Sequence, residues 1–201
     1  MIPVPLVTAL VLAGSRRGEG DPVARYRQAA AFALAGPQTL VTTADHALLD
    51  PTMLDHFLAT ADGVSADIAV ALASATVITA AYPASKRTYI RFRDDGYSGA
   101  NLFLLRTSAA ARGIEFWRRI ERDRKAPWRL ARAFGPVLLG AYLLRIATLH
   151  QAMRLISRRL GIEVAAVAMP MAEASIDVDK PADLDLVEDI LARRARAGAT
   201  A

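Results

Sequence analysis

The sequence predicts an α/β fold built on a mainly parallel sheet, and two observations carry this prediction. Short, continuous apolar runs, such as residues 6–13 and 40–44, are typical of strands that are buried on both faces. These runs alternate along the chain with longer segments in which apolar residues recur at helical spacing. Alternating strands and helices favour a sheet whose two faces are both covered by helices.

The first half of the chain repeats a strand-then-helix pattern. The helix at 22–35 is Ala-rich and is closed by Gly36-Pro37, whereas the next helix starts with Asp50 as its cap and Pro51 in its first turn. The expected strands of this half are residues 6–13, 40–44 and 66–72, and the expected helices are residues 22–35, 51–60 and 74–81.

The second half adds a hairpin and a group of helices to this pattern. Residues 88–93 and 97–106 flank the turn Asp94-Asp95-Gly96 and are expected to form the hairpin. The remaining expected elements are strands at 162–169 and 174–178 and helices at 108–124, within 128–160 and at 182–196. Because no internal repeat or linker is visible, we expect one domain over 1–201 with a helical insertion at about 107–160.

Composition narrows the class of protein. With 201 residues, 53% of them hydrophobic and 22% charged, the chain is long enough and apolar enough for one folded domain. It contains no cysteine, which excludes disulfides and thiolate chemistry. The apolar N-terminus lacks a basic leader, and no apolar run approaches the roughly 20 residues that span a membrane. We therefore expect a cytoplasmic protein.

The net charge of +5 comes mostly from arginine, which is densest over residues 112–132. Such a patch suits nucleic acid, an anionic membrane surface or a phosphorylated substrate, and it also suits a solvated helix face. No nucleic-acid-binding module is recognisable, so we expect no nucleic-acid partner. The apolar segment 137–149 suits a core helix, with peripheral membrane contact or a homodimer interface as alternatives.

A glycine-rich loop follows the first expected strand and has the sequence Gly14-Ser15-Arg16-Arg17-Gly18. Glycines allow backbone N–H groups to approach an anion, and arginines add positive charge, so the layout is that of a phosphate-binding loop. The loop matches neither of the common nucleotide-binding fingerprints. An ordinary turn with exposed arginines is the alternative.

Acidic residues follow two of the expected strands. Asp45 ends the apolar run at 40–44, while Asp177 and Asp179 alternate at the end of the run at 174–178. Ligands of open α/β sheets bind beyond the C-terminal ends of strands, and carboxylates together with phosphates are what Mg²⁺ prefers. We expect these carboxylates to converge on Mg²⁺, the alternative being that Asp177 and Asp179 only cap the last helix.

Other polar residues give weaker indications of a catalytic or binding role. His46 suits a general base but is better explained as a neighbour that supports Asp45, and 3 histidines are too few and too scattered for a zinc site. No serine lies in the G-x-S-x-G motif of hydrolases. Gly99 and Asn101 form a polar patch that either contacts a substrate or fixes a turn.

Four segments in this order resemble the MobA-like NTP transferase family. They are LVLAGSRRG at residues 10–18, LVTTADHALLDP at 40–51, SGANLFLLR at 98–106 and IDVDKPADLDL at 176–186. The resemblance implies a glycosyltransferase-A-type fold, a three-layer α/β/α sandwich on a mixed sheet. It also implies attack of an acceptor phosphate on the α-phosphorus of CTP or GTP, with release of pyrophosphate.

The resemblance assigns roles to residues of this chain. Arg16 and Asp45 would be catalytic, Asp45 would bind Mg²⁺ with Asp177 or Asp179, and the acceptor would face Gly99 and Asn101. The base and triphosphate would be lined by Leu12, Ala13, Gly14, Ser15, Arg16 and Arg17. Arg122 and Lys125, within the arginine cluster, would bind the phosphate of a phosphorylated small-molecule acceptor.

The chain departs from the family between the glycine-rich loop and Asp45. The family carries a lysine-containing segment there, whereas the first lysine of this chain is Lys86, so we expect a sheet that lacks this segment. Two alternatives to the nucleotidyltransferase follow: a catalytically impaired relative that binds nucleotide, and a nucleotide-sugar glycosyltransferase that uses the same carboxylates.

Overall fold

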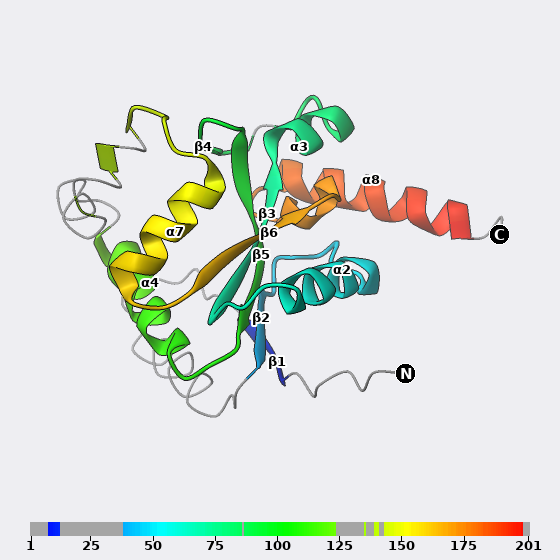
Figure 1. Cartoon of the computed structure of the whole chain (residues 1–201). Coiled ribbons are helices and arrows are strands. Elements are labelled where there is room, and N and C mark those ends of the chain that lie inside the picture. Colours follow the sequence, from blue (N-terminus) through cyan, green and yellow to red (C-terminus); the bar gives the residue numbers. More distant parts are fainter. Residues whose placement is uncertain are drawn as a thin grey trace.

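A mixed sheet with helices on both faces forms the centre of the computed structural model (Figure 1). The structure describes residues 8–12, 38–85, 87–123, 135, 139–140 and 143–198, with the backbone alone at 8–12, 118–123 and 198. The strands are β1 (Thr8–Leu12), β2 (Thr39–Thr43), β3 (Ile68–Ser74), β4 (Ile90–Arg91), β5 (Gly96–Leu105) and β6 (Val164–Met169). The helices are α2 (Pro51–Asp62), α3 (Ala75–Ala81), α4 (Ala110–Asp123), α7 (Leu149–Leu160) and α8 (Pro181–Gly198), with a 3₁₀ turn η1 (Ala172–Ser175).

The sheet order is β1-β2-β5-β3-β6, and the short β4 pairs with β5. β5 runs against β2, β3 and β4, while β1 is parallel to β2 and β3 to β6. The predicted α/β fold is thus confirmed. All strands except β5 run in the same direction, as a mainly parallel sheet requires. Because the reversed β5 lies in the centre of the sheet, three of the five strand pairs are nevertheless antiparallel.

This topology gathers several chain segments at one edge of the sheet. The C-terminal ends of β1, β2, β3 and β6 lie at the same edge as the N-terminal half of β5. Loops that leave this edge are therefore neighbours in space although they are distant in sequence. It is the edge at which open α/β sheets bind ligands.

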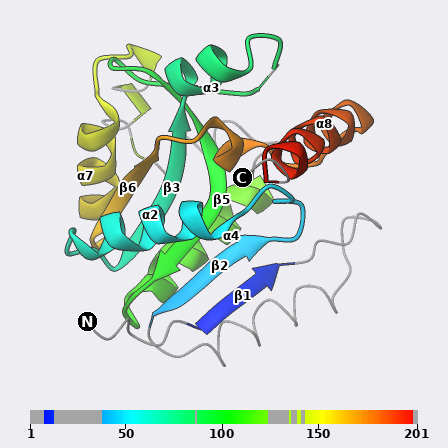
Figure 2. The same cartoon turned by 90° about the vertical axis from the view of Figure 1, so that its right-hand side faces the viewer.

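Helices α2 and α8 cover one face of the sheet, and α4 and α7 cover the other (Figures 1 and 2). On α2, the fully buried Met53 and Phe57 share a helix face and pack with Leu102 and Met169 of the sheet. Burying one such side chain contributes about 1.5–3 kcal/mol. The first face of the sheet is therefore held mainly by apolar contact.

The second face depends on a close approach of α4 to β3. A Cβ atom at Gly113 would lie 2.2 Å from Cδ1 of Ile68, so this position has no room for a larger residue unless Ile68 moves. Helix α7 begins with a capping box formed by Thr148 and Gln151 and ends at Gly161 in the left-handed conformation. Within the described residues, no helix has the length and apolarity that crossing a membrane requires.

One predicted strand is wrong. The strand was predicted at residues 174–178. In the structure, residues 172–175 form the 3₁₀ turn η1, and residues 176–179 belong to no strand. The segment leaves β6 and pairs with no strand of the described residues. Its first part bonds locally instead, because Ala174 N–H donates to Met171 C=O and Ile176 N–H to Glu173 C=O. The strand predicted at 88–93 is likewise reduced to Ile90–Arg91.

Candidate functional site

The loop after β2 positions Asp45. Leu40 and Val41 of β2 are buried in the core. The chain then turns, and the backbone N–H of His46 donates to the carbonyl of Thr43 at 3.3 Å. The carboxylate of Asp50 accepts from the backbone N–H of Met53 at 3.0 Å and so caps α2. A buried strand and a capped helix hold this loop from both sides.

The segment before α8 lies beside the same loop. The backbone N–H of Val178 donates to the carbonyl of Asp45 at 3.0 Å. Arg194 of α8 donates to the carbonyl of Leu48 at 3.3 Å and pairs with the carboxylate of Asp50 at 3.2 Å. Backbone and side-chain contacts together therefore fix α8 against the loop that carries Asp45.

This arrangement brings three carboxylates together. One carboxylate oxygen from each of Asp45, Asp177 and Asp179 lies within 4.8 Å of the other two. The contact arises from the bond between Val178 and Asp45 and not from the strand alternation that the sequence suggested. Like charges at this spacing repel one another unless a cation or a proton compensates them.

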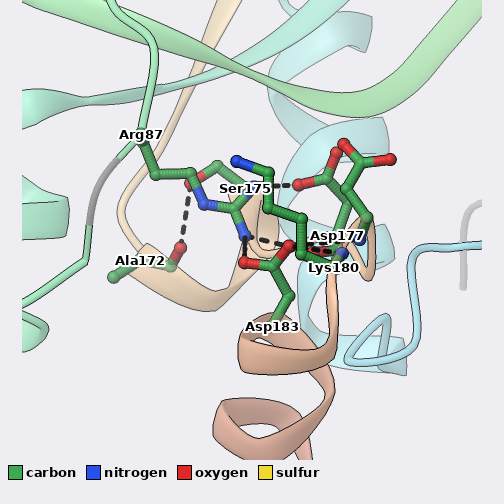
Figure 3. A network of polar contacts seen from close by, with 7 residues as sticks. Arg87, Ala172, Ser175, Asp177, Lys180 and Asp183 are labelled. Atoms are coloured by element: carbon green, nitrogen blue, oxygen red, sulfur yellow. Dashed lines mark hydrogen bonds and ion pairs between the residues drawn. The ribbon is translucent and has the colours of Figure 1, made fainter.

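One cation at the cluster is Arg87, which no pattern in the sequence indicated. Its guanidinium pairs with the carboxylate of Asp177, donates to the carbonyl of Asp177 at 3.2 Å and lies 3.9 Å from the carboxylate of Asp183 (Figure 3). Asp183 also accepts from the backbone N–H of Lys180 at 2.9 Å. No sequence motif marks Arg87, because its partners lie some ninety positions further along the chain.

The residues present fit a hard divalent cation such as Mg²⁺. The Oδ1 atom of Asp45 is buried and has no hydrogen-bond partner within the described residues. A buried carboxylate oxygen without a donor is costly, and a cation at this position would remove the cost. An all-carboxylate donor set suits Mg²⁺ better than zinc, so Asp45, Asp177 and Asp179 would be its ligands.

His46 lies next to this cluster in a buried position. Burial lowers the pKa of His46 below its usual 6.5, although the carboxylates of Asp45 and Asp50 oppose the shift. Neither ring nitrogen has a partner within the described part of the chain, and the same holds for the hydroxyls of Thr42 and Thr43. The end of β2 thus carries several buried polar atoms that a ligand is able to engage.

The other residues to which the sequence assigned roles are only partly placed by the structure. Leu12 ends β1 and pairs with Thr43 in register, which puts the start of the glycine-rich loop beside the end of β2. Ala13, Gly14, Ser15, Arg16, Arg17 and Lys125 lie outside the described residues. Arg122 is on α4, which covers the sheet face opposite to α8 (Figure 1).

Gly99 and Asn101 lie on β5 at the same edge of the sheet as the acidic cluster. Gly99 is exposed and pairs with Leu72, and the space that a Cβ atom would occupy there is open. Asn101 has a left-handed backbone, φ 49°, where the register between β3 and β5 shifts. Asn tolerates this conformation better than most residues, so a local backbone role explains Asn101 without a ligand.

Comparison with known proteins finds a likeness among solved structures. No family model and no curated protein matches the chain. Among solved structures, a hypothetical transferase from Thermus thermophilus superposes with a TM-score of 0.70 at 28% sequence identity. The match covers 86% of this chain and 78% of that one, so the two proteins share the fold over most of their length.

Proposed function

We propose that this chain is a Mg²⁺-dependent nucleotidyltransferase that moves a nucleoside monophosphate from CTP or GTP to a phosphorylated small molecule. The observation that carries the proposal is the convergence of Asp45, Asp177 and Asp179 within 4.8 Å at the ligand-binding edge of the sheet. The end of β1 at Leu12 adjoins the same edge, next to Thr43. The likeness to a hypothetical transferase supports the general class, and the MobA-like motifs support the nucleotidyl chemistry.

The reaction needs positioning more than it needs a reactive side chain. An oxygen of the acceptor phosphate bonds to the α-phosphorus, the bond from that phosphorus to the bridging oxygen breaks, and pyrophosphate leaves. Mg²⁺, when bound, neutralises phosphate charge and orients the triphosphate. The three carboxylates would hold the cation, and the neutral ring of His46 offers a hydrogen bond to a neighbouring polar group.

A second candidate function has one observation in its favour. The guanidinium of Arg87 already compensates the charge of Asp177, as a cation in the site would. A protein that binds nucleotide without a metal and without turnover would retain this ion pair. The experiment that tests the first proposal separates the two.

The test is a thermal-shift and pyrophosphate-release series with CTP and GTP, each with and without Mg²⁺. The variants are Asp45→Asn and Asp179→Asn, and the matched control is Asp55→Asn, which changes an exposed aspartate on α2. We expect one nucleotide to stabilise the wild type and the control only when Mg²⁺ is present. Asp45→Asn should abolish both the shift and the release.

Each outcome of this series has a distinct meaning. A nucleotide shift that does not depend on Mg²⁺ would favour the second candidate. Unchanged metal-dependent turnover in Asp45→Asn would overturn the site. Because asparagine relieves repulsion inside the cluster, Asp45→Asn should unfold no earlier than the wild type in the absence of metal, so a loss of binding would not reflect a loss of fold.

A further inference from the structure

A cavity lies beside the chain segment that follows Arg87. It has a volume of about 340 Å³ and is lined by Tyr89, Arg91, Leu143 and Arg145. Tyr89 and Arg91 come from the segment that continues from Arg87 into β4, and the other two residues come from the segment before α7. Two stretches that are distant in sequence therefore build it.

The cavity carries the positive charge of two arginines. Within the described residues, neither Arg91 nor Arg145 has an acidic partner. The acids of the adjacent hairpin are engaged elsewhere. Asp94 accepts from the hydroxyl of Tyr97 and the backbone N–H of Leu149, both at 3.0 Å. Asp95 accepts from the backbone N–H of Gly96 at 2.7 Å and from that of Thr76 at 3.3 Å. Two guanidinium groups thus share one hollow, and no acid of the described residues pairs with either of them.

The hydroxyl of Tyr89 adds a donor to this charge. Its oxygen is buried and has no partner within the part of the chain that the structure describes. The base of the side chain is tightly packed, because a Cβ atom at Gly96 would lie only 3.1 Å from the Cβ atom of Tyr89. The side chain of Tyr89 is therefore fixed in position while its hydroxyl lacks a hydrogen-bond partner among the described residues. Such a hydroxyl is pre-organised to donate to a ligand, since a buried polar group otherwise remains unsatisfied.

Arg145 is held in a costly conformation. Its backbone φ is 52°, in the left-handed region, which costs an L-residue other than glycine roughly 1–2 kcal/mol. Strain of this kind concentrates at binding sites, where the surrounding structure holds a side chain in place for a ligand. The strain is consistent with a role for the Arg145 side chain in the cavity.

The cavity lies close to the acidic cluster. Arg87 pairs with Asp177, and Tyr89 follows two residues later, so the Cα atoms of Arg87 and Tyr89 are at most about 7 Å apart. Ile90 pairs with Tyr97 at the start of β5, which places this segment at the ligand-binding edge of the sheet. The segment that lines the cavity is thus continuous in sequence with the residue that pairs with Asp177.

We propose that this cavity binds the phosphate monoester group of the acceptor, with Arg91, Arg145 and the hydroxyl of Tyr89 as donors. Guanidinium groups bind phosphate through paired, charge-assisted hydrogen bonds, and two of them match the dianion. Leu143 provides an apolar wall for the carbon skeleton next to that phosphate. That the ligand is an acceptor rests on the proposed function, whereas phosphate binding at the cavity does not.

The experiment measures phosphate binding without nucleotide and without Mg²⁺. The soluble probe is glycerol 3-phosphate, followed by calorimetry, and the lipid probe is phosphatidylcholine vesicles containing phosphatidic acid, followed by co-sedimentation. The variants are Arg91→Gln, Arg145→Gln and Tyr89→Phe, and the control is Arg193→Gln on the exposed surface of α8. Arg145→Gln makes the same demand on the backbone as the wild type, so it removes the guanidinium without adding backbone strain.

Each arginine variant should weaken binding roughly 10-fold or more, Tyr89→Phe by a smaller factor, and Arg193→Gln not at all. Binding of the glycerol ester would assign a soluble acceptor, and binding of the vesicles alone, lost in the same variants, would assign a lipid headgroup. No binding of either probe, or equal binding by wild type and arginine variants, would overturn the proposal. A failure here leaves the result with Asp45→Asn untouched, and a failure of that result leaves phosphate binding to stand by itself.

Discussion

Replacing Arg87 with methionine removes the guanidinium that pairs with Asp177 in the acidic cluster and keeps most of the side-chain volume. The pair it makes with Asp177 is largely shielded, since the two side chains are 12% and 23% exposed. The variant leaves Asp177 partly buried without this partner, next to Asp45 and Asp179. It should therefore be less stable than the wild type, and more receptive to a divalent cation.

The size of both effects follows from this geometry. Loss of a half-buried hydrogen bond between charged groups costs about 1.5–3 kcal/mol, which lowers the melting temperature by roughly 3–12 °C in a chain of this length. A single charge about 5 Å from a divalent ion repels it by on the order of 1.5 kcal/mol even at the dielectric constant of water. Removing Arg87 should therefore raise the affinity for Mg²⁺ about tenfold.

Melting curves with and without Mg²⁺ measure both effects at once. The matched control is Arg106→Met, because Arg106 pairs with Asp62 at the opposite edge of the sheet. Both variants should melt early without metal, and a limiting concentration of Mg²⁺ should stabilise Arg87→Met more than Arg106→Met, because the tenfold gain in affinity is confined to the variant without Arg87. If Mg²⁺ stabilises neither variant, the assignment of the three carboxylates as a cation site is refuted, and if it stabilises both equally, the repulsion by Arg87 is refuted.

Three further predictions concern the scaffold. Tyr82→Phe removes the 2.6 Å hydrogen bond to Glu173 and should cost about 1 kcal/mol in urea unfolding at neutral pH. Burial and that bond raise the pKa of Tyr82 to about 12, so this stabilisation should be complete below pH 10 and lost as the pH rises towards 12. Thr107→Val removes the hydrogen bond that is the main cause of the lowered pKa of Asp67, so the stability difference from wild type should be full at neutral pH and shrink as the pH falls below 3.8. Gly161→Ala should cost about 1 kcal/mol, because alanine disfavours φ 65° although no atom blocks its Cβ, and an unchanged urea midpoint would contradict this account.

Local signals in the sequence were sufficient for individual elements. The apolar run at 40–44 corresponds to β2 at Thr39–Thr43, and the Asp50-Pro51 start corresponds to the observed cap of α2. Both signals act within a few residues: an apolar run favours burial, and a side-chain oxygen satisfies a free backbone N–H nearby. The same reasoning predicted a strand at 174–178, and this prediction was wrong. An apolar run becomes a strand only where another strand is available to pair with it.

The sequence by itself determined the fold class and the position of Asp45 at the end of a buried strand. Tertiary structure alone decided that β5 runs in the centre of the sheet, that Arg87 pairs with Asp177, and that Arg91 and Arg145 face one cavity. These contacts join residues about fifty to ninety positions apart. They depend on which strands pair and on how the connecting segments cross the sheet edge, and those choices are settled by burial over the whole chain and not by any local pattern.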